Sequence, residues 1–183
     1  TVDSADVNVK MTAMDGELGT ITMAGIESVS VNSSGGFDAS YTLATPNATS
    51  LTINNEADLT ATDSNAGTVT ITSNLAETLN INSLGDIIVS DNTNKLSKLT
   101  SVNINSQTAN KTVDVTSLTT TATALATDGI TINVRGAGNA NIGVDTNFGT
   151  YNATSNPDKV TINATGSGDI TVLYNNYSAN TII

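Results

Sequence analysis

Leu79-Asn80-Ile81-Asn82 is one copy of a four-residue phrase made of an apolar residue, a polar residue, Val or Ile, and Asn. Copies of this phrase recur along most of the chain. They are Val29–Asn32, Leu51–Asn54, Leu79–Asn82, Val102–Asn105, Ile130–Asn133 and Val160–Asn163. Successive copies start 22, 28, 23, 28 and 30 residues apart. A period of this length is typical of solenoids and other repeat architectures.

A second strand-like phrase accompanies several of these copies at a distance of ten or eleven residues. Val69-Thr70-Ile71-Thr72 precedes Leu79 by ten residues, and Val113-Asp114-Val115-Thr116 follows Val102 by eleven. Strict alternation of apolar and polar residues gives each phrase one apolar face and one polar face. Two short strands per repeat, joined by turns, make one coil of a parallel β-solenoid, and stacking the coils buries the apolar faces.

The fold class that follows is all-β, with a parallel β-solenoid (β-helix or β-roll-like) of roughly 22–30-residue coils as its architecture. The alternative is a tandem β-sandwich, because hairpins between the phrases would also fit the irregular spacing. We expect residues 1–183 to form a single repetitive β domain, and the missing initiator Met indicates a piece of a longer or processed chain. The solenoid prediction places the apolar residues of the phrases in one core: Val29, Val31, Leu51, Ile53, Leu79, Ile81, Val102, Ile104, Ile130, Ile132, Val160 and Ile162.

Composition narrows the functional classes. The chain has 17 Asp and Glu against 6 Lys and Arg, and its net charge is −11. That charge disfavours nucleic acid and anionic membrane surfaces as partners, and favours multivalent cations or simple solubility. The chain contains neither Cys nor His, which excludes thiolate chemistry, disulfides and His-based metal sites or general bases. No apolar run approaches the roughly 18 residues of a membrane span.

The Asn that ends each phrase is the most specific signal in the sequence. In stacked coils these residues would lie above one another, where their amides hydrogen-bond along the stack as a ladder. Alternatively, each Asn simply starts a turn, because Asn tolerates left-handed backbone conformations. Both interpretations are structural.

Two glycine-rich turns are candidate calcium sites, because they loosely match the calcium-binding nonapeptide G-G-x-G-x-D-x-U-x. Their candidate ligands and turn residues are Gly136, Gly138, Asn139, Asn141 and Asp145 in the first turn, and Gly166, Gly168 and Asp169 in the second. Ca²⁺ is the cofactor that they suggest. The alternative is that both segments are ordinary turns.

No catalytic set appears in the sequence, so we expect no enzymatic activity. Glycosidases need two carboxylates in one cleft, whereas the Asp and Glu residues here are scattered. Arg135 is the only arginine, and we expect it to be solvated. Dense threonines suggest an ice-binding array as a further alternative, although Thr is also a common exposed strand residue.

Stretches such as 99–105 and 129–138 resemble those of bacterial surface-layer (S-layer) proteins and of large repeats-in-toxin adhesins. In these families calcium rigidifies β-rich domains and drives lattice assembly outside the cell. The resemblance implies a secreted, structural cell-surface protein that self-assembles into an S-layer or filament and is stabilised by calcium. Its partners would be copies of itself and cell-surface polysaccharide. The alternatives are an adhesin or ice-binding solenoid module and, third, a carbohydrate-active β-helix enzyme.

Strand edges and coil ends are the expected assembly contacts, because soluble proteins usually protect edges with Lys or Pro. The segment from Asp169 to Ile183 contains neither Lys nor Arg. Its candidate contact residues are Tyr174, Tyr177, Ile182 and Ile183. The alternative is that the fragment was cut at this end, and that the next repeat of the same chain covers it.

Overall fold

The structure is a computed structural model that describes residues 3–11, 17–35, 40–57, 66–92, 96, 98–118, 130–144, 159–174 and 180–182. Every helix or strand in these ranges is a β-strand. The strands are β1 (Ser4–Met11), β2 (Glu17–Thr22), β3 (Ser28–Gly35), β4 (Ser40–Ala44), β5 (Ser50–Ala57), β6 (Gly67–Thr72), β7 (Thr78–Ser83), β8 (Ile87–Asp91), β9 (Ser101–Ser106), β10 (Thr112–Val115), β11 (Ile130–Gly136), β12 (Asn139–Val144), β13 (Lys159–Ala164), β14 (Ile170–Tyr174) and β15 (Asn180–Ile182).

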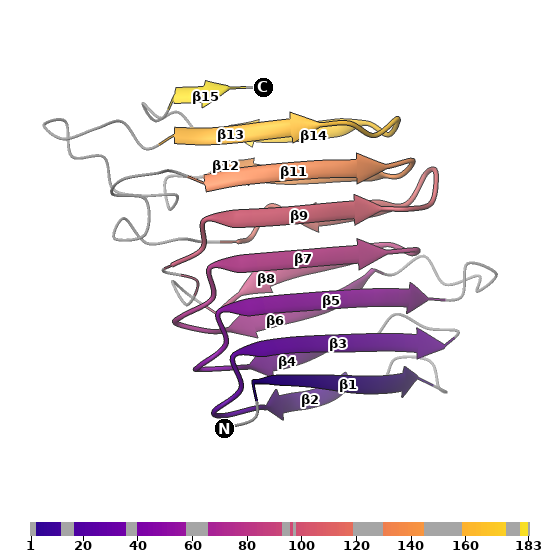
Figure 1. Ribbon diagram of the computed structural model, residues 1–183. Helices are drawn as coiled ribbons and strands as arrows, with labels where there is room; N and C mark the ends of the chain where they lie inside the picture. Colours follow the sequence, from indigo (N-terminus) through magenta and orange to yellow (C-terminus); the bar gives the residue numbers. More distant parts are fainter. Residues whose placement is uncertain are drawn as a thin grey trace, which may run out of the picture.

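The strands form two parallel sheets that face one another. Sheet A has the order β1-β3-β5-β7-β9-β11-β13-β15, and sheet B has the order β14-β12-β10-β8-β6-β4-β2. The chain therefore crosses from one sheet to the other after each strand and rises by one coil for every two strands, as Figure 1 shows. This is a parallel β-solenoid, as predicted. The sandwich alternative is wrong, because hairpins would pair consecutive strands, whereas here the paired strands are one coil apart.

Coil length varies from coil to coil, and between β9 and β11 it exceeds the 28-residue spacing of the phrases by two residues. Ser28 pairs with Ser50, Ser50 with Thr78, and Ser101 with Thr131, so these coils are 22, 28 and 30 residues long. Paired strands stay in register although the coils differ in length, so the additional residues lie in the turns. Turns tolerate insertions because they lie at the surface.

The core runs along the solenoid between the two sheets. All twelve apolar residues predicted to face it are buried, with exposed fractions of 2% or less. Sheet B contributes a matching set that includes Leu43, Ile71, Val89, Val113 and Ile142. Period-two alternation produces this pattern, because successive side chains of a strand point to opposite faces of the sheet.

One buried row of the core is polar. Ser33, Asn55, Ser83 and Ser106 are each at most 5% exposed and stack at the ends of their strands, where the chain turns towards sheet B. The Nδ2 amide of Asn55 donates to Ser83 Oγ at 3.0 Å, and Ser83 Oγ donates to the Gly85 carbonyl at 2.7 Å. A buried polar group is tolerated when it is hydrogen-bonded in this way.

The apolar core is only partly covered at its two ends. Val7, Ile21, Met23 and Ile26 pack on it from the first coil, and Ile170 and Val172 from the last, and all six remain half-buried. Leu18 on β2 and Leu173 on β14 are exposed, at 43% and 53%. β2 and β14 are also the two edges of sheet B (Figure 1). Within the described residues, no helix is long and apolar enough to cross a membrane.

Candidate functional site

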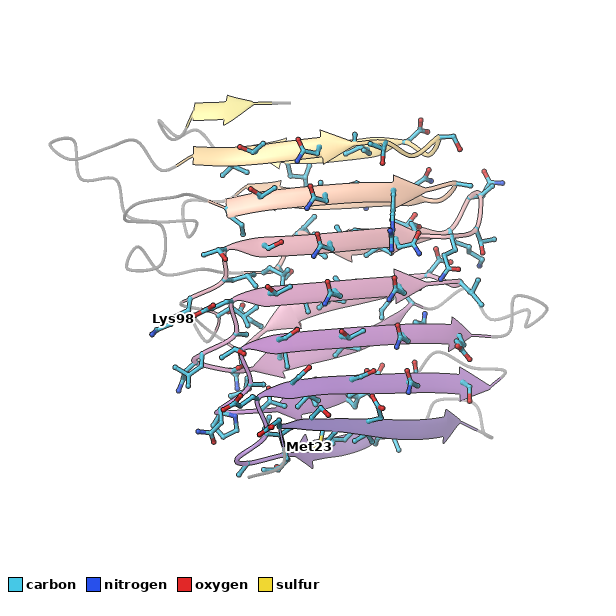
Figure 2. The ribbon with its side chains drawn as sticks, viewed as in Figure 1. Met23 and Lys98 are labelled. Carbon is cyan, nitrogen blue, oxygen red and sulfur yellow. The ribbon has the colours of Figure 1, made fainter. Side chains whose placement is uncertain are left out.

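Three rows of outward polar side chains on β3, β5, β7, β9, β11 and β13 form a surface that we call the amide face. Figure 2 shows these polar side chains repeating from strand to strand on sheet A. The amide face has three rows in register: Ser28, Ser50, Thr78, Ser101, Thr131 and Thr161; Ser30, Thr52, Asn80, Asn103, Asn133 and Asn163; and Asn32, Asn54, Asn82, Asn105 and Arg135. Arg135 is the one charged residue in these rows.

Side-chain amides hydrogen-bond along the third row. Asn54 Nδ2 donates to Asn32 Oδ1 at 2.6 Å, and Asn82 Nδ2 donates to Asn54 Oδ1 at 2.8 Å. Asn105 Nδ2 donates to Asn82 Oδ1 at 3.4 Å, which is the longest step. These are four of the six phrase-ending asparagines, and the predicted ladder is confirmed for them.

The last two phrase-ending asparagines continue a different ladder, two residues along the strand. Asn103 Nδ2 donates to Asn80 Oδ1 at 2.9 Å, Asn133 Nδ2 donates to Asn103 Oδ1 at 2.8 Å, and Asn163 Nδ2 donates to Asn133 Oδ1 at 2.8 Å. The expectation of a single column of six is therefore wrong between β9 and β11. A shift of two residues is allowed because it keeps every side chain on its own face of the sheet.

A shallow groove of about 210 Å³ lies on the amide face where the two ladders run side by side. Its lining residues are Thr52, Asn80, Asn82, Asn103, Asn105 and Arg135. Arg135 is exposed, as the sequence indicates. Across the described ranges its guanidinium has no ion pair, and the one salt bridge there joins Lys111 Nζ to Asp86 Oδ2 at 3.0 Å.

The two glycine-rich turns stack on one another at the ends of successive coils. Gly138 N donates to the Ser106 carbonyl at 2.9 Å, and Ser167 N donates to the Gly136 carbonyl at 2.9 Å. A Cβ atom at Gly136 would collide with the Ser106 carbonyl, and one at Gly168 would collide with the Gly138 carbonyl. The glycines therefore permit close approach of stacked backbones.

Two of the side chains proposed as calcium ligands make hydrogen bonds within the protein. Asn139 Oδ1 accepts a hydrogen bond from the Asp169 backbone N–H at 3.0 Å, which joins the two turns. Asn141 lies on β12, away from the turn, and its Nδ2 donates to Asp114 Oδ2 at 3.3 Å. Asp145 lies outside the described residues. No group of three Asp, Glu, His or Cys side chains that could hold a metal occurs within the described ranges.

Hydroxyl side chains dominate part of the outward face of sheet B. Thr20, Thr42, Thr70 and Ser90 are in register on β2, β4, β6 and β8. A depression of about 380 Å³ lies on this surface, lined by Gly19, Ser40, Tyr41, Thr42, Thr68 and Thr70. The neighbouring row loses its hydroxyls at β8 and β10, where Ile88 and Asp114 follow Thr68.

No protein family model, curated protein or solved structure matches this chain.

What the molecule does must therefore be argued from its own geometry. The sequence alone did not indicate the Arg135 groove, because the groove depends on the two-residue shift that places Arg135 above Asn105. It also did not indicate the buried polar row, although a signal is visible. Each of the first four phrases is followed by a Ser or Asn, and alternation points that residue inwards.

Proposed function

We propose that this chain is a structural, non-catalytic segment of a secreted cell-surface protein, and that copies of it stack end to end into a filament or S-layer. The observation that carries the proposal is the pair of open coil ends. Inward-facing apolar side chains, such as Ile21 at one end and Val172 at the other, stay half-buried because no further coil covers them in the described ranges.

Unpaired strand edges support the same proposal. Within the described ranges β2 pairs only with β4 and β14 only with β12, so each leaves one row of backbone donors and acceptors open. Open edges invite pairing with another strand, and solenoids usually need polar capping repeats at their ends to remain soluble. Because the two ends differ, one end docks on the other, and a contact of this head-to-tail type propagates into a filament.

The hydrogen bonds of two described carboxylates support a non-catalytic role. The carboxylate of Asp86 accepts hydrogen bonds from Lys111 Nζ at 3.0 Å and from the Thr112 backbone N–H at 2.7 Å. Asp114 accepts hydrogen bonds from Thr116 N at 2.9 Å and from Asn141 Nδ2. Both carboxylates tie neighbouring backbone or coils together, which is a structural use.

Two substitutions test the stacking. Ile21→Lys and Val172→Lys each place a charge on one open end, and we expect either one to abolish assembly in sedimentation velocity experiments. Thr22→Lys and Thr171→Lys are the matched controls, because these exposed neighbours point to the opposite face of the same strands. Melting curves establish that all four variants stay folded. Assembly that is unchanged by both core-facing substitutions would overturn the proposal.

Calcium dependence is a second part of the proposal and comes from the resemblance to S-layer and repeats-in-toxin proteins. Asn139 Oδ1 accepts a hydrogen bond from the Asp169 backbone N–H, so the two candidate ligands lie on adjacent stacked turns. Electron microscopy with calcium and with a chelator tests this dependence, and Asp169→Asn should weaken it. Equal assembly with calcium and with the chelator would contradict calcium dependence. It would leave the stacking proposal unchanged.

Ice binding is a second candidate function, and the row of Thr20, Thr42, Thr70 and Ser90 favours it. The hydroxyls of Thr70 and Ser90 lie 3.3 Å apart, and successive coils repeat at about 4.8 Å. Thermal hysteresis measurements test this function. An effect that is lost in Thr42→Lys and Thr70→Lys but kept in Thr131→Lys, on the opposite sheet, would support it.

A further inference from the structure

We propose that the Arg135 groove binds a carboxylate-bearing sugar, such as one unit of an acidic polysaccharide. The groove has one cation, Arg135, and five amide or hydroxyl side chains around it. Its volume of about 210 Å³ is below the roughly 300–1,000 Å³ of pockets that hold drug-sized ligands, so it suits a single sugar ring.

The guanidinium provides the anion-binding part of the groove. Arg135 is exposed on β11, and across the described ranges it makes no ion pair. A guanidinium presents a planar fork of N–H donors that matches a carboxylate with two parallel hydrogen bonds. The other members of the three rows of the amide face are uncharged, so no neighbouring carboxylate in those rows competes for Arg135. Exposed charges more than about 8 Å apart are largely screened from one another at physiological ionic strength.

The amides provide the hydroxyl-binding part. Asn105 is the last amide of its row, and the residue in register above it is Arg135 rather than another asparagine. Asn105 Oδ1 therefore receives no ladder hydrogen bond from the next strand and can accept one from a ligand. The Nδ2 groups of Asn82 and Asn103 each use one N–H in a ladder, which leaves a second N–H for a ligand oxygen.

This combination favours an acidic sugar over a simple carboxylate ligand. A carboxylate alone can only accept hydrogen bonds, so it satisfies Arg135 but not Asn105 Oδ1. A uronate carries a carboxylate and hydroxyl donors on one ring and can satisfy both. The inference deepens the proposed cell-surface role, since stacked copies would present one groove each and gain avidity for a polymer. Binding by a single copy does not require stacking.

The test uses the assembly-deficient Val172→Lys chain, so that only single-copy binding is measured. Sodium glucuronate, glucose and sodium acetate are titrated while the side-chain amide signals of the asparagines are followed by NMR. We expect saturable shifts at Asn82, Asn103 and Asn105 with glucuronate, and weaker binding of both other ligands. Arg135→Gln should reduce glucuronate affinity about tenfold, as expected for loss of a charge-assisted bidentate contact.

Lys98→Gln is the control, because it removes the same charge from an exposed turn on the side of the molecule where the strands of sheet A begin (Figure 2). It should leave the affinity unchanged. Equal affinity of Arg135→Gln and the parent chain, or equal losses in both variants, would overturn the proposal. Acetate that binds as tightly as glucuronate would overturn the assignment to a sugar and indicate a site that recognises the carboxylate alone. These outcomes leave the stacking proposal untouched, because stacking is blocked throughout.

Discussion

Asn133 donates its side-chain amide to Asn103 at 2.8 Å and lies two residues out of step with Asn105, the residue that ends the preceding phrase. The turn explains this shift. Gly136 is in register with Ser106, and its positive φ of 105° and missing Cβ let the two backbones approach closely. The close contact at Gly136 therefore favours this register between β9 and β11. The register in turn places Asn133 opposite Asn103.

Asn103 is a ladder residue whose loss should cost more stability than loss of the last residue in the second column. It donates to Asn80 and accepts from Asn133, and it is half-buried. We expect Asn103→Ala to lower the free energy of unfolding by about 1–3 kcal/mol, since two hydrogen bonds of about 1 kcal/mol each are lost. Asn163→Ala is the control, because Asn163 is exposed and donates a single ladder bond. Equal effects in urea denaturation would contradict a cooperative ladder.

Alanine substitutions at three glycines distinguish the stability cost of backbone strain from the cost of steric collision. Gly25 has a φ of 78° in open space, Gly168 has no positive φ but faces the Gly138 carbonyl, and Gly136 combines both features. We expect Gly25→Ala to cost about 1 kcal/mol and Gly168→Ala about 2 kcal/mol. Gly136→Ala should cost the most. Thermal and urea denaturation of the three variants check this order, and a Gly136→Ala chain as stable as Gly25→Ala would refute the close stacking of turns.

Tyr41 should make the stability depend on alkaline pH. Burial raises the pKa of its hydroxyl, which has no hydrogen-bond partner in the described ranges. In the unfolded chain this pKa is about 10. The folded state therefore holds its proton longer, and stability is lost as pH rises above about 10, by up to about 1.4 kcal/mol per pH unit.

Tyr41→Phe isolates this effect, because all other titrating groups are the same in both chains. At pH 7 the substitution should be neutral or slightly stabilising, since it removes an unsatisfied buried hydroxyl. Between pH 10 and 11.5 the parent chain should lose stability relative to the variant. If the difference in the free energy of unfolding between the two chains is the same at every pH, the hydroxyl ionises as easily in the folded chain as in the unfolded one.

Much of the fold could be predicted from the sequence, because solenoid coils repeat one local pattern. Alternation in Leu51–Asn54 and its copies determines which side chains face the core, and the six-copy period determines the stacking. The ladder was predictable for the copies up to Asn105. The prediction was wrong at Asn133. A two-residue shift preserves the alternation of apolar and polar residues, so the pattern within the phrase cannot reveal the shift.

The candidate sites were harder to predict for the same reason. Glycine-rich turns at 136–138 and 166–168 resemble metal-binding turns in sequence, but close stacking also requires glycine, and the two demands leave similar patterns. The Arg135 groove depends on which residues of four different coils become neighbours. That information lies in the register, which is a relation between distant segments.

Head-to-tail stacking predicts a specific result when two variants with opposite blocked ends are mixed. The Ile21→Lys chain keeps one intact end and the Val172→Lys chain keeps the other, so each should be monomeric alone. An equimolar mixture should form a dimer of twice the 18.6 kDa monomer mass in sedimentation velocity experiments, and nothing larger. A mixture that stays monomeric while the unsubstituted chain assembles, or single variants that assemble on their own, would contradict head-to-tail stacking.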